Sequence, residues 1–253
     1  RRRQRQMCIR DRFYGYVDAG RFYQNNEEVW ALKPIDMTTG KPANYYRATS
    51  FSEGAGDIYV VDLDGDGKIT ADGDRTYLGN SNPDFFGGFG STVYWKGLMV
   101  NLTFSYSVGG KRFWSDEASK FGGVNNFNSP DFILDSWTMQ GVGAKYPVAT
   151  HYGVGQNSVF TNRWLHDASY VRLSALNLSY RLPQKWFKKS LIKGVEATFQ
   201  ATNLFTITKY PGMDPQGNFS VSTANNALYG MGTDYSFYPV AKTFNFGIKF
   251  TIN

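Results

Sequence analysis

Residues 62–74 form an acidic segment whose composition and spacing suit the binding of a hard cation. It begins Asp62-Leu-Asp64-Gly-Asp66-Gly67, with carboxylates at its first, third and fifth positions and glycine at its sixth. Carboxylates at this spacing surround a cation such as Ca²⁺ with oxygen ligands, and the glycine permits a sharp turn. The main-chain carbonyl at the seventh position, Lys68, adds a further ligand. The segment is therefore a candidate Ca²⁺ loop.

The closing ligand of this loop does not follow the usual spacing. Position 12 is Gly73 instead of an acid, with Asp72 and Asp74 on either side. We therefore expect the loop to close differently or to bind Ca²⁺ more weakly, and an Asp- and Gly-rich loop without metal is the alternative. In either case the loop would brace the chain rather than catalyse. The candidate ligands are Asp62, Asp64, Asp66, Lys68, Asp72 and Asp74.

Patterns that carry out catalysis are missing from the sequence. The chain has only two histidines, His151 and His166, and no Gly-x-Ser-x-Gly, His-Glu-x-x-His or phosphate-binding loop. We therefore expect no enzymatic activity. Three tryptophans of one long connection have rings that could stack on sugars, and packing within the loop is the alternative. These are Trp114, Trp137 and Trp164.

The positive charge of the chain is concentrated at its beginning. The formal net charge is +6, but without the six arginines and the single aspartate of residues 1–12 the remainder carries only +1. This balance argues against a nucleic-acid partner, which would require a basic surface. The opening RRRQRQMCIRDR resembles translated sequencing-adapter read-through. Residues 1–12, with the only cysteine, Cys8, are therefore expected to be non-native, and a genuine basic arm is the alternative.

Alternation of apolar and polar residues predicts an all-β fold. Leu98–Val108 and Phe244–Ile252 alternate without interruption, which is typical of strands with one apolar face. An aromatic content of 17 % and 27 glycines also favour strands and turns over helices. Four further strands are expected, around Phe13–Tyr23, Gly87–Trp95, Ser169–Leu182 and Val195–Ile207.

The connections distinguish a membrane barrel from a soluble sandwich better than the strands do. Trp95-Lys96-Gly97 predicts a tight turn, whereas Gly109–Ala168 and Tyr210–Tyr238 are long connections. Short turns at one end and long loops at the other are typical of outer-membrane barrels, and two such long loops are unusual in a sandwich. No run of 18 apolar residues occurs, so no transmembrane helix is expected.

Six blocks of sequence support the barrel by their order and spacing. The blocks are Phe13-Tyr-Gly-Tyr16, Gly56-Asp-Ile58, Asp74-Arg-Thr-Tyr-Leu-Gly-Asn80, Ser169-Tyr-Val-Arg-Leu173, Asn203-Leu-Phe-Thr-Ile-Thr-Lys-Tyr210 and Asp214-Pro215. Together, from about Phe13 to the end of the chain, they resemble the C-terminal part of SusC/RagA-family TonB-dependent transporters. Three features depart from the family: Asp64 replaces the usual Asn, Gly73 is extra, and the chain ends Phe250-Thr-Ile-Asn253 rather than on an aromatic residue.

The resemblance implies that residues 13–253 are the C-terminal segment of a large antiparallel transmembrane β-barrel with long extracellular loops. It further implies the outer membrane of a Gram-negative cell, contact with outer-membrane lipid, and active import of a glycan or peptide ligand. A SusD-like surface lipoprotein and the TonB complex are the implied partners, the latter through an N-terminal region that this chain lacks together with the plug.

An isolated segment of such a barrel would be an open, curved sheet. Its unpaired edge groups are not tolerated in hydrocarbon, so we expect that the chain alone does not insert as a functional barrel. The alternative is a secreted or surface β-sandwich, braced by Ca²⁺, that acts as a carbohydrate-binding or adhesive module. In that fold the apolar strand faces would be buried in a core between two sheets.

Overall fold

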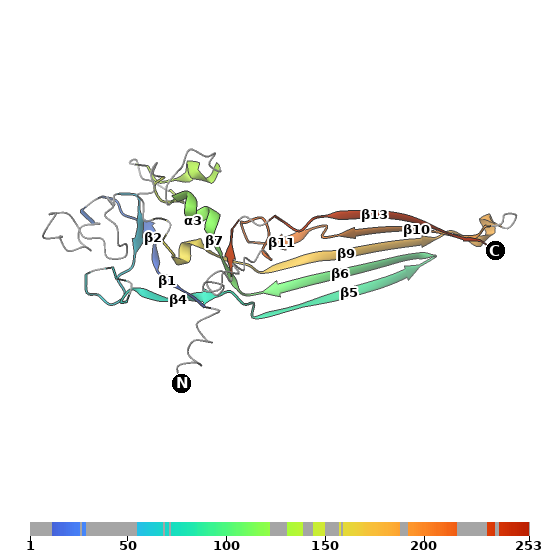
Figure 1. Ribbon diagram of the computed structural model, residues 1–253, viewed down its shortest axis with the longest axis horizontal. Coiled ribbons are helices and arrows are strands. Elements are labelled where there is room, and N and C mark those ends of the chain that lie inside the picture. Colours follow the sequence, from blue (N-terminus) through green and yellow to red (C-terminus); the bar gives the residue numbers. More distant parts are fainter. Residues whose placement is uncertain are drawn as a thin grey trace, which may run out of the picture. The chain divides into compact units, whose positions relative to one another are not determined.

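Figure 1 shows the computed structural model. The chain divides into two compact units. The loop unit comprises Arg1–Ser81, Lys111–His166 and Asn218–Ser236, and the sheet unit comprises Asn82–Gly110, Asp167–Gly217 and Phe237–Asn253. Residues 1–11 with Cys8, Lys68 and His151 lie outside the described residues. Those described are 12–25, 27–28, 55–67, 69–70, 72–121, 131–138, 144–149, 157, 159–187, 192–216, 232–235 and 238–252.

The sheet unit contains one antiparallel sheet, whose five long strands lie side by side in Figure 1. Their order is β13-β10-β9-β6-β5, and the short strand β11 pairs with β9 beyond the end of β10. The predicted strand at Leu98–Val108 is confirmed residue for residue. The bounds are β5 Phe85–Trp95, β6 Leu98–Val108, β9 Tyr170–Arg181, β10 Ile192–Thr202, β11 Thr206–Thr208 and β13 Thr243–Ile252.

The register of this sheet places apolar side chains of all five long strands on one face. Because successive side chains point to opposite faces, adjacent rows across the sheet differ in chemistry. One row consists of Val93, Val100, Leu178, Phe199 and Phe246, and the next row consists of Thr92, Asn101, Asn177, Gln200 and Asn245.

The apolar face of the sheet has no covering layer within the sheet unit. Phe246 is 81 % exposed and Ile248 is 66 % exposed, although both lie in the middle of β13. A β-sandwich would bury these side chains against a second sheet. The two-layer core that the sandwich alternative requires is therefore not found among the described residues of this unit.

The short and long connections lie at opposite ends of the sheet. Lys96 and Gly97 have φ angles of 47° and 90° and make the predicted two-residue turn between β5 and β6. The chain passes between the two units after Ser81, Gly110, His166, Gly217 and Ser236. The strand ends nearest to these residues in the sequence are all remote from that turn. This arrangement is the predicted one.

Two predicted strands are broken in the structure. Val195–Ile207 divides into β10 and β11 because Asn203 has a φ of 52° and turns the chain from β13 toward β9, where its N–H donates to the Ser174 carbonyl at 3.1 Å. Phe13–Tyr23 divides at Val17 into β1 (Arg12–Tyr16) and β2 (Asp18–Phe22), because the two halves pair with different strands.

The loop unit is built from three small sheets and short helices. β1 pairs with β4, β2 pairs with β3, and β7 lies between β12 and β8. Among the described residues no helix is long and apolar enough to cross a membrane. The bounds are β3 Ile58–Val60, β4 Arg75–Asn80, β7 Lys111–Trp114, α3 Ser115–Phe121, η1 Asp131–Asp135, η3 Asn162–Trp164, β8 Leu165–Asp167 and β12 Thr233–Asp234.

An aromatic core holds the loop unit together. Phe121 stacks on Tyr146 and on Trp164, with ring centroids 5.2 and 5.6 Å apart. Phe22 and Trp137 belong to the same buried cluster. The connection expected as a long loop, Gly109–Ala168, therefore contributes much of a packed core, because its aromatic residues bury enough apolar surface to order it.

Candidate cation site

The acidic segment lies between β3 and β4 and is anchored at both ends. β3 pairs with β2, and β4 pairs with β1. Within the segment, Ile69 is completely buried and packs with Tyr16 and Val60. An apolar residue that is buried in the middle of a polar loop restricts the path of the chain on both sides of it. The buried side chain of Ile69 therefore fixes the middle of the acidic segment.

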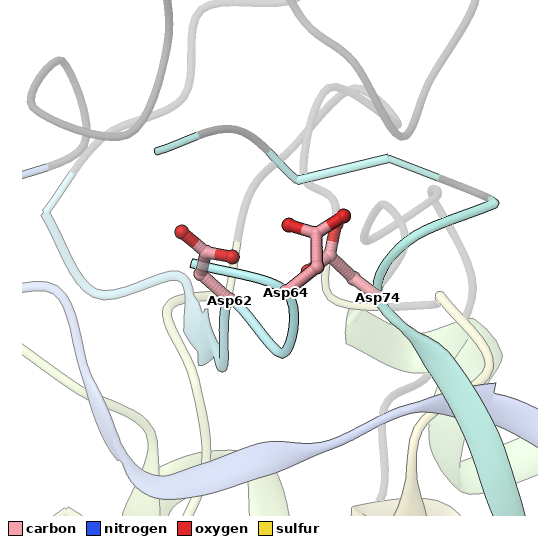
Figure 2. Close-up of side chains that lie close together, drawn as sticks. All are labelled: Asp62, Asp64 and Asp74. Carbon is pink, nitrogen blue, oxygen red and sulfur yellow. The ribbon is translucent and has the colours of Figure 1, made fainter. Parts of the chain in front are cut away.

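Three carboxylates converge in this loop. Figure 2 shows Asp62 and Asp64 beside Asp74, which directly precedes β4. Ligand oxygens of the three side chains lie within 4.8 Å of one another. Two oxygens that share one Ca²⁺ at about 2.4 Å can be at most about 4.8 Å apart. The three carboxylates therefore fit a single hard cation, with Asp64 exposed and Asp74 fully buried.

Main-chain hydrogen bonds hold two of these carboxylates. The carboxylate of Asp62 accepts hydrogen bonds from the N–H groups of Gly65 and Gly67 at 2.7 and 2.9 Å. Asp74 accepts from Leu63 at 2.8 Å and from Thr70 at 2.5 Å. Each oxygen keeps a further lone pair after these bonds. The loop thus has its own internal support and still offers oxygen ligands.

The electrostatic environment of the two loop aspartates differs. Desolvation disfavours the charged form of Asp62, but the hydrogen bonds from Gly67 and Gly65 outweigh it and lower its pKa. For Asp64 the hydrogen bond from the Asp66 N–H lowers the pKa, but desolvation and the charges of Asp66, Asp74 and Asp62 prevail and raise it. A bound cation would relieve this repulsion between carboxylates.

The structure brings together three of the six predicted ligands. Asp66 and Asp72 are exposed and lie outside the group of three, and the position of Lys68 is not described. Of the two acids that flank Gly73, Asp74 is the one that closes the loop. A Cβ atom on Gly73 would lie 2.0 Å from Oδ2 of Asp64, so a side chain at position 73 would require the Asp64 carboxylate to move.

Comparison with known proteins finds TonB-dependent receptors. No family model matches it. It is 31 % identical to the TonB-dependent receptor P3 of Formosa agariphila over 202 residues, which cover 78 % of this chain and 19 % of that protein. It is 28 % identical to the TonB-dependent receptor SusC of Bacteroides thetaiotaomicron over 251 residues, 92 % of this chain and 22 % of SusC.

A solved structure agrees with these relatives. A chain of the RagAB peptide transporter superposes with a TM-score of 0.60 at 26 % identity over 94 % of this chain and 22 % of that one. The chain belongs to the SusC/RagA family of TonB-dependent receptors. It spans about a fifth of the length of the relatives it matches. The predicted family is confirmed, and so is the all-β fold class, because the antiparallel sheet matches part of a TonB-dependent β-barrel.

Two of the three tryptophans proposed for sugar stacking in this SusC/RagA segment are core residues. Trp164 is completely buried, and its Nε1–H donates to the Asn157 carbonyl at 2.9 Å. Trp137 is 8 % exposed in the same core. Trp114 is half-buried, with its ring edge-on to Phe132. Trp137 and Trp164 therefore present no free ring face to a sugar here, and the alternative of packing describes them.

A buried carboxylate, Glu117, adjoins this core, whereas the sequence left open that Glu117 and Asp116 are a solvated pair. Glu117 of α3 accepts a hydrogen bond from the Tyr146 hydroxyl at 3.1 Å and lies 2.5 Å from His166 Nε2. Burial, together with the negative charge of Glu117, raises the pKa of Tyr146 to about 12. Tyr146 thus remains a hydrogen-bond donor at neutral pH. His166, which the sequence placed in a loop, has a structural partner.

A second buried ionic group lies in the sheet unit of this receptor segment. Arg172 of β9 donates to Asp214 at 2.7 Å, to Gln216 at 2.6 Å and to Thr206 of β11 at 2.8 Å. Asp214 also accepts from the N–H groups of Gln216 and Val240 at 2.9 and 3.3 Å. The network therefore ties together two strands and both ends of the connection between Gln216 and Val240.

Proposed function

We propose that this chain forms part of the barrel wall of an outer-membrane, TonB-dependent active importer of nutrients. The observation that carries the proposal is the exposed apolar face of the sheet, opposite a face of hydroxyl and amide groups. A barrel in a bilayer needs an apolar surface toward lipid and a polar surface toward its lumen. The sheet satisfies both requirements with a single layer.

The dimensions of the sheet support the same proposal. β5, β6 and β10 have eleven residues each, and a tilted strand crosses a bilayer in about 9–11 residues. The row through Val93 and Leu178 contains no charged side chain in any of the five long strands. A charge at this depth on the lipid side would cost about 2–4 kcal/mol.

The relatives supply the wider assignment. RagAB is described as a peptide transporter and SusC as a TonB-dependent receptor. By extension, the whole protein would import a glycan or peptide across the outer membrane. A SusD-like lipoprotein would act as its surface lid, and the TonB complex would act through a region outside this chain. The chain itself is assigned no catalytic step.

The decisive experiment compares neighbouring residues on the two faces of β13. After Cys8 is replaced with serine, Phe246→Cys and Asn245→Cys are each labelled with an environment-sensitive fluorophore, and the chain is refolded with lipid vesicles. The label at position 246 is expected to emit at shorter wavelength and to be quenched by nitroxide-bearing lipids, because its face contacts acyl chains. The label at position 245 is expected to remain accessible to aqueous quenchers.

The same two labels test the soluble sandwich. A monomeric chain without lipid, with the position 246 label already shielded from aqueous quenchers, would contradict a barrel wall and favour the sandwich. Equal quenching of both positions by lipid would contradict the assignment of faces. Quenching at position 246 alone, only in the presence of vesicles, is the expected outcome.

We also propose that Asp62, Asp64 and Asp74 bind Ca²⁺ and so brace the junction of β3 and β4. The proposal rests on the acidic spacing and on the convergence of three carboxylates within 4.8 Å. Binding to the folded state alone stabilises it by about 2.7 kcal/mol when Ca²⁺ is present at 100 times its dissociation constant. The ion would act on structure and not on a reaction.

Thermal unfolding with Ca²⁺ or with a chelator tests this site. Ca²⁺ is expected to raise the melting temperature of the loop unit, as followed by tryptophan fluorescence, and Asp64→Asn is expected to abolish that increase. Asp64 suits the test because it is the exposed member of the group. Asp72→Asn is the matched control, since Asp72 is exposed outside the group. A shift that survives Asp64→Asn would place the ion elsewhere.

A further inference from the structure

The short-turn end of the sheet carries aromatic and cationic side chains at adjacent positions. Three dipeptides have this pattern: Trp95-Lys96, Tyr180-Arg181 and Lys185-Trp186. The first two are neighbours, because the Arg181 N–H donates to the Gly97 carbonyl at 2.9 Å. The third belongs to η4 (Gln184–Trp186), which follows β9 closely. In Figure 1 this is the end at which β5 meets β6.

The aromatic members of these pairs are not packed into a core. Trp95 and Trp186 are 64 % and 65 % exposed, and Tyr180 is 39 % exposed. The Lys96 ammonium lies 5.1 Å from the centroid of the Trp95 ring, a cation–π distance. The Arg181 side chain is 75 % exposed. The Trp95-Lys96 and Lys185-Trp186 pairs therefore present flat rings and positive charges at the same exposed edge. Arg181 points to the opposite face of the sheet from Tyr180, toward Glu196.

The charge at this end of the sheet is strongly unbalanced among the described residues. The one acid is Glu196, which accepts a hydrogen bond from Ser179 and lies 3.8 Å from Arg181. In the register Glu196 lies between Arg181 and Lys249 on the polar face. It is therefore paired with these two cations rather than with Lys96 of the turn or Lys185 of η4.

We infer that this aromatic–cationic rim (Trp95, Lys96, Tyr180, Lys185 and Trp186) binds the headgroups of anionic phospholipids. Indole and phenol rings settle at the level of the headgroups, with their polar atoms toward water. Lysine side chains beside them reach phosphate oxygens while their stems remain against apolar surface. The inference rests on the proposed barrel wall, which places this rim at a bilayer surface.

The leaflet follows from the position of the turns. Short turns of outer-membrane barrels face the periplasm, and long loops face the exterior. The rim contains the two-residue turn at Lys96 and Gly97, and the passages to the loop unit are at the opposite strand ends. The rim therefore belongs to the periplasmic leaflet, and its partner is a phospholipid of that leaflet.

The test measures partition of the 253-residue chain between water and two kinds of vesicle. One kind is phosphatidylcholine alone, and the other contains phosphatidylglycerol as well. The rim variant is Lys96→Asn with Lys185→Gln, asparagine being chosen because residue 96 has a positive φ. The control is Lys209→Gln with Lys242→Gln, which removes the same charge from exposed positions at the loop end of the sheet.

The original chain is expected to bind the anionic vesicles more tightly than the neutral ones. The rim variant should lose roughly 30-fold in partition onto anionic vesicles, with little change on neutral ones, and the control variant should lose less than roughly threefold. High salt should remove the difference, since it screens exposed charges.

Three results would overturn the inference. Equal losses in the rim and control variants would mean that only net charge matters. Equal binding of the original chain to both vesicles would mean that the rim does not recognise anionic headgroups, while the barrel-wall proposal would stand on the labels in β13. Binding to neither vesicle would remove the barrel-wall proposal and this inference with it.

Discussion

Replacement of Arg172 with methionine is expected to lower the free energy of unfolding of the sheet unit by about 3–5 kcal/mol. The Arg172 and Asp214 side chains are 5 % and 6 % exposed, and their nitrogen and oxygen atoms lie 2.7 Å apart. Methionine fills similar space but leaves the Asp214 carboxylate buried without its cation. Urea unfolding of the chain in detergent micelles, followed by circular dichroism, measures the loss.

Arg181→Met provides the matched control on the same strand. Arg181 is 3.8 Å from Glu196, and its side chain is 75 % exposed. An ion pair of this kind contributes about 0–1 kcal/mol. Arg172→Met combined with Asp214→Leu should recover part of the stability, since no unpaired buried charge then remains. If Arg172→Met were as mild as Arg181→Met, the buried network would not stabilise the sheet.

Replacement of Trp164 with alanine is expected to destabilise the loop unit by about 3–5 kcal/mol, because it opens a cavity in a packed core. Trp164 is completely buried and stacks on Phe121 at 5.6 Å with rings 12° from parallel. Thermal unfolding followed by near-ultraviolet circular dichroism, which reports the packing of aromatic rings, measures the effect.

Two further variants separate packing from ligand stacking. Trp164→Phe keeps an aromatic ring but leaves the Asn157 carbonyl without its donor, so a loss of about 1–3 kcal/mol is expected. Trp114→Ala, at a half-buried position, should be milder than Trp164→Ala. A Trp164→Ala chain of unchanged stability would contradict the core assignment and reopen the hypothesis of sugar stacking.

Much of the sheet could be predicted because its strands and its tight turn are determined by residues that are close in sequence. The strand at Leu98–Val108 follows from residues that alternate in polarity along the chain, and the turn follows from Lys96 and Gly97 themselves. The break at Asn203 was not predictable in this way. Its cause is a carbonyl of β9, Ser174, which is distant in sequence and becomes a partner only once the strands are aligned.

The candidate site shows the same division. The spacing of Asp62 and Asp64 could be recognised because the two residues are close in sequence. The choice of Asp74 over Asp72 depends on the folded loop, in which Asp74 is buried and accepts hydrogen bonds from Leu63 and Thr70. The pairing of Arg172 with Asp214 joins two sequence blocks, and neither block alone specifies the other. The burial of Trp137 and Trp164 likewise depends on partners such as Phe22 that lie far away in the chain.

The two edge strands of the sheet have a consequence for the closure of any barrel that contains it. Four successive antiparallel pairings lead from β5 to β13, so the two edges run in the same direction. Joined directly, they would make a parallel pair. An odd number of additional antiparallel strands between them restores alternation and gives the even total of bacterial outer-membrane barrels. Insertion or deletion of a hairpin elsewhere in the wall preserves this parity, whereas gain or loss of a single strand would leave one parallel pair where the barrel closes.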